Sequence, residues 1–240
     1  MKRFIAFLLL VAAAPWCMAS SENEPLDPVY INLSDTASLQ RGARLFVNYC
    51  LSCHSAAYMR YRRMAQDLDI SEELLKDNLM FAGDKPGDLM RTTMPAKYAK
   101  DWFGVVPPDL TLIARVRKPD WIYTYLRNFY LDDGSPSGWN NSLLQNVAMP
   151  HVLYGLQGSQ RLVSKSGEGD GKPVFRLKKP GTMAPEEYDN AMRDLTNFLV
   201  YLGEPVKLDR YLIGVFVMLF LGGLLVLSYL LKKEYWKDLH

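Results

Sequence analysis

Cys50-Leu51-Ser52-Cys53-His54 is the stretch from which the rest of this sequence is best interpreted. Two thiols at this spacing can add to the two vinyl groups of a haem, and the imidazole that follows then lies beneath the iron as a ligand. The chain has only three cysteines and three histidines in 240 residues, so chance is a poor explanation of the pattern. The motif predicts one covalently bound haem c, with Cys50 and Cys53 as its thioether residues and His54 as the proximal iron ligand.

The same pair of cysteines also fits a dithiol oxidoreductase, so the surrounding sequence has to discriminate between the two. A redox-active CxxC pair belongs to a βαβ context in which the first cysteine begins a helix. Here the motif instead follows a stretch with helical periodicity, residues 38–49. The position of the motif therefore favours haem attachment.

Two apolar patterns predict helices on either side of the motif. In residues 38–49 the apolar positions repeat on one side of a helix, with Gly42 and Phe46 on a shared face. A second helical pattern begins at Pro185 and stops at Gly203. In small c-type cytochromes two such helices cross closely, and a glycine lets the backbones approach. We expect a mainly α fold, a cytochrome c-like haem domain with long loops, plus one C-terminal transmembrane helix.

The two ends of the chain predict export and membrane anchoring. Residues 1–19 have the layout of a secretory signal peptide, with Lys2 and Arg3 before an apolar run and a small residue, Ala19, at its end. Near the other end, Tyr211–Leu231 contains no charged residue, and roughly 20 apolar residues suffice to cross a bilayer. The transmembrane anchor is assigned to residues 209–231.

The export signal and the lysines that follow the anchor set the expected orientation. We expect residues 20–208 to form a periplasmic haem domain and residues 232–240 a short cytoplasmic tail. The chain would thus be a single-pass protein of the bacterial inner (cytoplasmic) membrane. A net charge of +2, with no long Lys/Arg-rich stretch outside the membrane, predicts no nucleic-acid partner.

Iron held by one imidazole needs a second protein ligand for electron transfer, or an open face for small-molecule chemistry. Met94 and Met149, each followed by proline, are the main thioether candidates, with Met183 as a third. His151 is the one other histidine of the predicted exported domain, so a bis-imidazole site would have to use it. Spacing alone does not separate Met94 from Met149.

Several further motifs occur in a fixed order along the chain. The motif and Ser55 are followed by Tyr58, Tyr61 and Arg62, then by Pro107-Pro108-Asp109-Leu110, Arg115, Arg117, Met149-Pro150, Gly181-Thr182 and Glu204-Pro205. In this order, between an export signal and one C-terminal anchor, the sequence resembles the cytochrome c1 family over roughly residues 30–235.

The resemblance implies particular site residues and partners. It makes Met149 the distal iron ligand, with Met94 as runner-up, and gives Arg115 the role of pairing with a haem propionate, which a guanidinium can bind with two parallel hydrogen bonds. It also implies a place in the cytochrome bc1 complex with cytochrome b and the Rieske iron–sulfur protein. Single electrons would pass from the Rieske protein to cytochrome c, with no substrate bond made or broken in this subunit.

Two other functions remain open at this point. The chain could be a membrane-anchored cytochrome subunit of a terminal oxidase, which would share the motif and the anchor. It could also be a haem enzyme or gas sensor whose sixth coordination position is open.

Overall fold

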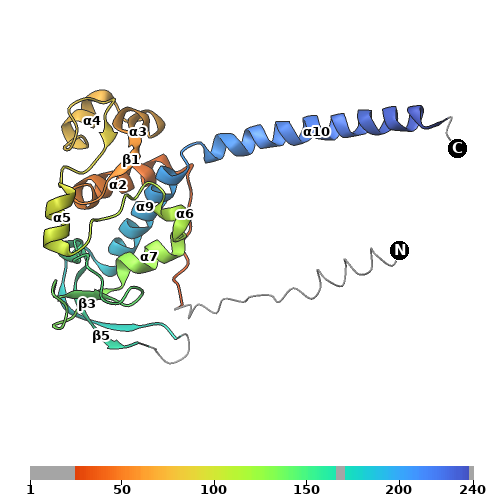
Figure 1. Ribbon diagram of the computed structural model, residues 1–240. Coiled ribbons are helices and arrows are strands. Elements are labelled where there is room, and N and C mark those ends of the chain that lie inside the picture. Colours follow the sequence, from red (N-terminus) through yellow and green to blue (C-terminus); the bar gives the residue numbers. More distant parts are fainter. Residues whose placement is uncertain (1–24, 166–170, 238–240) are drawn as a thin grey trace.

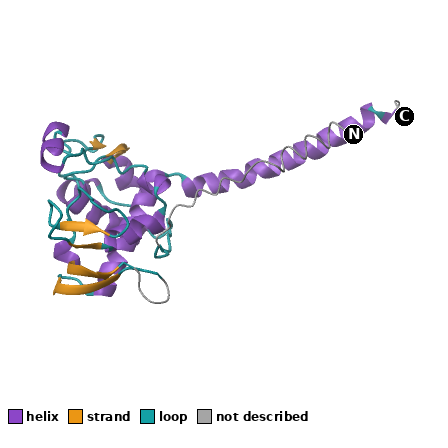
Figure 2. Ribbon diagram, turned by 60° about the horizontal axis from the view of Figure 1, so that its bottom comes forward, coloured by secondary structure: helices purple, strands orange, loops and turns teal. Residues whose placement is uncertain are grey.

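The computed structural model describes residues 25–165 and 171–237 (Figure 1). The expected signal peptide, residues 1–19, and the last residues of the expected tail, 238–240, lie outside the described part. Within that part, a helical domain is followed by one long helix that projects away from it in both views (Figures 1 and 2). The prediction of a mainly helical domain with a C-terminal apolar helix is confirmed.

The core is built on two helices from opposite ends of the domain. Helix α2 spans Thr36–Leu45 and continues into a π-helical turn, η1, at Phe46–Cys50. Helix α9 spans Pro185–Gly203, close to the range predicted from its apolar spacing. The two helices pack against each other, and Phe46 meets Phe198 with their ring centroids 5.6 Å apart. The helix pair expected from the sequence is therefore present.

The ends of these helices have local chemical causes. The Asp35 side chain accepts a hydrogen bond from the backbone N–H of Ser38, at 2.9 Å, and so caps α2. Pro185 occupies the first turn of α9, where its missing N–H costs nothing, and Glu187 accepts from the N–H of Ala184 at 2.9 Å.

Gly42 is the point of closest approach between α2 and α9. A Cβ atom at this position would clash with the Asp194 carbonyl oxygen and would lie 2.6 Å from the Phe198 Cβ. Beside this contact, the guanidinium of Arg41 pairs with the Asp194 carboxylate at 2.5 Å, and Ser38 donates to the same carboxylate at 2.7 Å. A glycine here thus allows both the backbone contact and the polar pairs that flank it.

Shorter helices and three small sheets fill the space between α2 and α9 in the sequence. The helices are α3 (Tyr61–Asp67), α4 (Glu72–Asn78), α5 (Ala96–Phe103), α6 (Ile113–Val116), α7 (Pro119–Arg127) and α8 (Tyr154–Gln157). The sheets are antiparallel pairs: β1 (Ala56–Arg60) with β2 (Leu89–Met90), β3 (Phe129–Leu131) with β4 (Trp139–Asn141), and β5 (Gly158–Ser164) with β6 (Val174–Pro180). Figure 2 shows the longer strands at the lower side of the domain and one short pair apart from them near the top, an addition that was not predicted from the sequence.

Helix α10, Lys207–Tyr235, contains the stretch expected as the membrane anchor. Its most apolar 18-residue stretch has a mean hydropathy of 2.5, and none of that stretch is buried against the rest of the chain. Among the described residues it is the one helix long and apolar enough to cross a membrane. Only Glu204, Pro205 and Val206 separate it from α9.

The Gly42 contact predicts a strong and position-specific effect on stability. Gly42→Ala should lower the free energy of unfolding by roughly 1–3 kcal/mol, because the added methyl group would force α2 and α9 apart. Denaturant unfolding followed by circular dichroism measures this change. Gly87→Ala is the matched control, since a Cβ at Gly87 would meet nothing within 4 Å. Equal stability of the two variants would contradict the account of the helix crossing.

Candidate haem site

The two cysteines lie where the first core helix ends. Cys50 is the last residue of η1 and is buried, whereas Cys53 is half-buried in the turn that follows. The N–H groups of Cys53 and His54 both donate to the carbonyl of Cys50, at 3.0 and 2.8 Å. Burial raises the pKa of the Cys50 thiol to about 12. A cysteine that ends a helix and stays protonated lacks the setting of a dithiol oxidoreductase, whose nucleophile is a thiolate at a helix N-terminus.

The imidazole of His54 is held in one orientation by the proline-rich segment. Its Nδ1 lies 2.8 Å from the carbonyl oxygen of Pro108, so Nδ1 carries the proton and donates, while Nε2 is left with a free lone pair. Burial lowers the pKa of His54, which favours the neutral ring that binds a metal. The backbone N–H of Leu110 donates to the Ser55 carbonyl at 2.8 Å and ties the two segments together.

Asp109 strengthens the same junction. One of its carboxylate oxygens accepts from the N–H of Ala57 at 2.8 Å, and the other accepts from the N–H of Thr111 at 2.8 Å. Asp109 and Leu110 therefore fasten the chain to Ala57 and Ser55 directly after the Pro108 carbonyl that orients His54.

Met94 belongs to a segment that packs on the motif itself. Thr92 donates its hydroxyl to the Ser52 carbonyl at 2.6 Å, and its N–H donates to the Ser55 hydroxyl at 3.0 Å. The N–H of Met94 in turn donates to the Thr92 hydroxyl oxygen at 3.1 Å. Met94 is thus tied through Thr92 to the residues around His54.

Met149 is contacted by a side chain of a different element, helix α7. The hydroxyl of Tyr125 lies 3.6 Å from the Met149 sulfur, within the range of a hydrogen bond to a thioether. Tyr125 stacks on Trp121 with ring centroids 4.9 Å apart, and burial raises the pKa of its hydroxyl, which therefore remains a donor. Met183, the third thioether candidate, packs against the core and lines a cavity elsewhere in the domain.

His151 lies in an aromatic enclosure. It is 2 % exposed, its ring is stacked on Phe129 at 4.9 Å, and Trp139 meets it edge-on at 5.0 Å. Burial lowers the pKa of His151 to about 4, while an interaction with Gln157 opposes that effect. This ring is neutral and packed within the protein.

The two arginines singled out by the sequence have different surroundings. Arg115 donates to Glu204 at 3.1 Å, and its side chain is 55 % exposed. The guanidinium of Arg117 instead lies over the ring of Trp121, 5.0 Å from its centroid. Arg117 therefore stands at the end of the aromatic stack that leads to Met149, whereas Arg115 already has a carboxylate partner.

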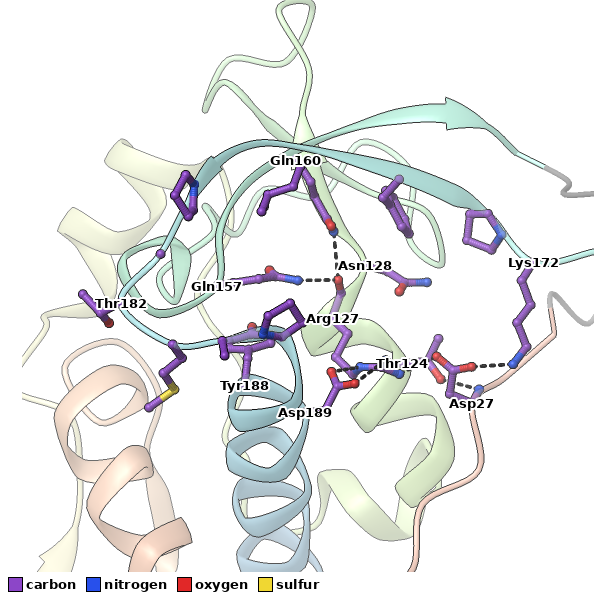
Figure 3. Close-up of a pocket in the computed structure, with 18 of the residues that line it drawn as sticks. Asp27, Thr124, Arg127, Asn128, Gln157, Gln160, Lys172, Thr182, Tyr188 and Asp189 are labelled. Carbon is purple, nitrogen blue, oxygen red and sulfur yellow. Dashed lines mark hydrogen bonds and ion pairs between the residues drawn. The ribbon is translucent and has the colours of Figure 1, made fainter.

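A cavity of about 580 Å³ lies beneath the β5–β6 hairpin, away from the motif (Figure 3). Its charged side chains are paired with one another: Arg127 lies between Asp27 and Asp189, at 2.6 Å from each. Its lining does not include Cys50, Cys53, His54 or Met149. None of the four proposed haem-binding residues therefore lies in the wall of this cavity.

Neither Tyr125 nor the Pro108 carbonyl was predicted as part of the site. The Pro107-Pro108 pattern does not by itself show that a carbonyl oxygen meets His54 from 54 residues away. Tyr125 is one of several partly buried aromatic residues of α7 that pack against the core, which is what its position in the sequence also suggests. Both contacts depend on the fold, so no local signal in the sequence identifies them.

The donor set fits a covalently bound haem. It comprises two cysteines at the end of a helix, an imidazole with one nitrogen fixed and the other free, and a thioether that accepts from a buried hydroxyl. Together with the two crossed core helices and an apolar helix able to cross a membrane, these features define a membrane-anchored c-type cytochrome.

Comparison with known proteins names the family. The model of the Cytochrome C1 family matches residues 29–160, and the chain belongs to this family. Its members carry one covalently bound haem c. They are the electron-transfer subunits of respiratory Complex III, the cytochrome bc1 complex, where they assemble with cytochrome b and the Rieske protein, and this chain is such a membrane-anchored subunit.

Two similar proteins align with all or nearly all of this chain. A cytochrome c1 from Allochromatium vinosum is 53 % identical over 100 % of both sequences. A protein from Nitrosomonas europaea, named ammonia monooxygenase gamma subunit, is 52 % identical over 99 % of this chain and 100 % of its own, and is a cytochrome c1-like homologue under another name. A solved structure of a hyperthermophilic respiratory Complex III covers 99 % of this chain and 96 % of its own, with a TM-score of 0.47 and 17 % identity, too distant to add to the assignment.

Proposed function

We propose that this subunit receives single electrons from the Rieske protein and passes them to cytochrome c through a haem held by Cys50, Cys53, His54 and Met149. The observation that carries the proposal is the His54 imidazole, whose Nδ1 is fixed by Pro108 and whose Nε2 is left free. When bound, the haem supplies an iron that alternates between ferrous and ferric states. The protein's part is to keep the iron ligands in place during that change.

The attachment side of the proposed site is rigid. Cys50 and Cys53 lie in a single hydrogen-bonded turn, and the His54 ring is fastened to the Pro107–Leu110 segment. A ligand that hardly moves between oxidation states keeps the reorganisation energy small. The hydrogen bond to Pro108 also makes the ring a better electron donor to a metal.

The surroundings of the two methionines favour Met149 as the distal ligand. Met94 is tethered through Thr92 to Ser52 and Ser55, the chain that carries the proximal histidine, and so is poorly placed for the opposite face. Met149 approaches from the α7 side and already accepts a hydrogen bond from Tyr125. A histidine–methionine pair gives a higher reduction potential than two imidazoles, as suits electron transfer to cytochrome c.

The ligand assignment is tested by substituting each methionine in the full-length complex. Met149→Leu should abolish the absorption band of thioether-bound ferric haem, let reduced protein bind carbon monoxide rapidly, and slow electron transfer to cytochrome c. Met94→Leu should leave all three unchanged. Both variants should keep haem on the peptide that contains Cys50 and Cys53, because the thioether bonds do not depend on the sixth ligand. Loss of the band in Met94→Leu alone would make Met94 the ligand.

Carbon monoxide binding to the unmodified protein addresses the alternative of an open sixth position. Rapid binding by intact reduced wild-type protein would reject thioether ligation altogether. Purification of the wild-type complex addresses the terminal-oxidase alternative, since cytochrome b and the Rieske protein are expected to accompany this chain.

We also propose that Arg115 pairs with a haem propionate, as the family resemblance implies. The structure gives Arg115 a protein partner, Glu204, which also pairs with Arg210, so a propionate would have to share this arginine. Arg117, on Trp121, is the neighbouring guanidinium against which the proposal has to be tested.

The two arginines are distinguished by the reduction potential. Arg115→Ala should lower it by roughly 10–40 mV, because removing a cation near the haem stabilises the ferric state, and an exposed pair is worth less than about 1 kcal/mol. Arg117→Ala is the matched control, expected to leave the potential unchanged. A shift in Arg117→Ala and none in Arg115→Ala would transfer the role to Arg117.

We propose that the haem domain, residues 20–208, faces the periplasm of a bacterial inner membrane and that residues 232–240 face the cytoplasm. The signal-peptide pattern of residues 1–19 and the lysines after the anchor support this orientation. A reporter enzyme active only in the cytoplasm, fused after residue 240, should therefore be active. An active periplasmic reporter at the same position would reverse the assignment.

A further inference from the structure

We propose that His151 is a positioning residue for the Met149 thioether, which it holds in place through a buried aromatic stack. This inference rests on the proposed ligation by Met149. His151 is not itself an iron ligand in this account. Its role is to fix the backbone from which the Met149 side chain extends.

The backbone between the two residues is stiff. Only Pro150 separates Met149 from His151. The proline ring locks its own φ angle, and it confines the preceding residue, Met149, to extended conformations. These restrictions reduce the number of ways in which the Met149 backbone can move independently of His151.

The His151 ring itself has little room to move. Phe129, 1 % exposed, covers one face with nearly parallel planes, inclined by 6°, and Trp139 closes the side at an interplanar angle of 71°. These two aromatic residues lie on the paired strands β3 and β4. The Met149 segment is thus fastened to a sheet and not merely to a surface loop.

The same stack also reaches the Met149 sulfur. Phe129 meets the ring of Tyr125 edge-on at 5.1 Å, and the Tyr125 hydroxyl lies 3.6 Å from the sulfur. The position of Met149 is therefore restricted in two ways: His151 holds its backbone, and Tyr125 contacts its side chain. Both routes meet on Phe129, so one rigid aromatic group defines where the thioether lies.

Two buried polar atoms without partners in the described part of the chain give a reason for a histidine in this enclosure. The Nε2 of His151 and the Oε1 of Gln157 are both buried without a hydrogen-bond partner among the described residues. The amide nitrogen of Gln157 donates to the Arg127 carbonyl at 2.8 Å, as Figure 3 shows, which fixes the amide and leaves Oε1 as an acceptor. A proton on Nε2 that bonded to Oε1 would satisfy both atoms and fasten the ring to the end of α7.

The inference is tested by measuring how readily an external ligand displaces Met149 in the full-length holoprotein. Imidazole binds ferric haem only in molecules whose thioether has left the iron, so its apparent affinity reports that fraction. His151→Ala should raise this affinity about 10-fold, weaken the thioether band and lower the reduction potential, because the open population grows. His151→Phe retains the stacked ring and should stay within about 3-fold of wild type.

A control separates this role from ordinary core packing. Leu75, 1 % exposed in α4, lies in the core outside the aromatic stack, and Leu75→Ala should lower the melting temperature without changing imidazole affinity. The inference is overturned if His151→Ala keeps the wild-type affinity for imidazole. It is also overturned if His151→Phe or Leu75→Ala raises that affinity as much as His151→Ala does. Survival of the thioether band in Met149→Leu would instead reject the ligand assignment on which the inference rests.

Discussion

The contact between α2 and α9 at Gly42 is the constraint on which the rest of the domain depends. Because no side chain stands between the helices there, the Asp194 backbone reaches α2 directly and its carboxylate binds both Ser38 and Arg41. The motif begins where α2 and its π-helical turn end. The position of both cysteines relative to the core is thus set by this crossing.

The motif is fixed to the two core helices. The rest of the proposed haem site is formed by segments that lie between α2 and α9 in the sequence. The segments after α2 reach the motif through backbone and side-chain hydrogen bonds at Pro108, Asp109 and Thr92. Met149 instead lies beside Tyr125 of α7, whose ring packs edge-on against Phe129 of β3. The domain therefore holds one proposed ligand by polar contacts near the helix end and the other by apolar packing.

The features that sequence analysis could predict are those with a local signal. The periodic apolar residues of α2 and α9 and the uncharged run within α10 each describe a single element, so their helices and approximate ends follow from the sequence. The three strand pairs were not predicted, since two of them are short and the longer pair, β5 with β6, carries no clear alternation. Tyr125 was missed because its function depends on a residue 24 positions away.

The short junction between α9 and α10 has a consequence for how electrons move through the assembly. Glu204 pairs with Arg115 on the domain side and with Arg210 on the anchor side, and Pro205 stiffens the link between them. A link of three residues limits how far the domain can move away from its membrane helix. We therefore expect the haem domain to stay close to the membrane surface, so that its redox partners have to come to it there.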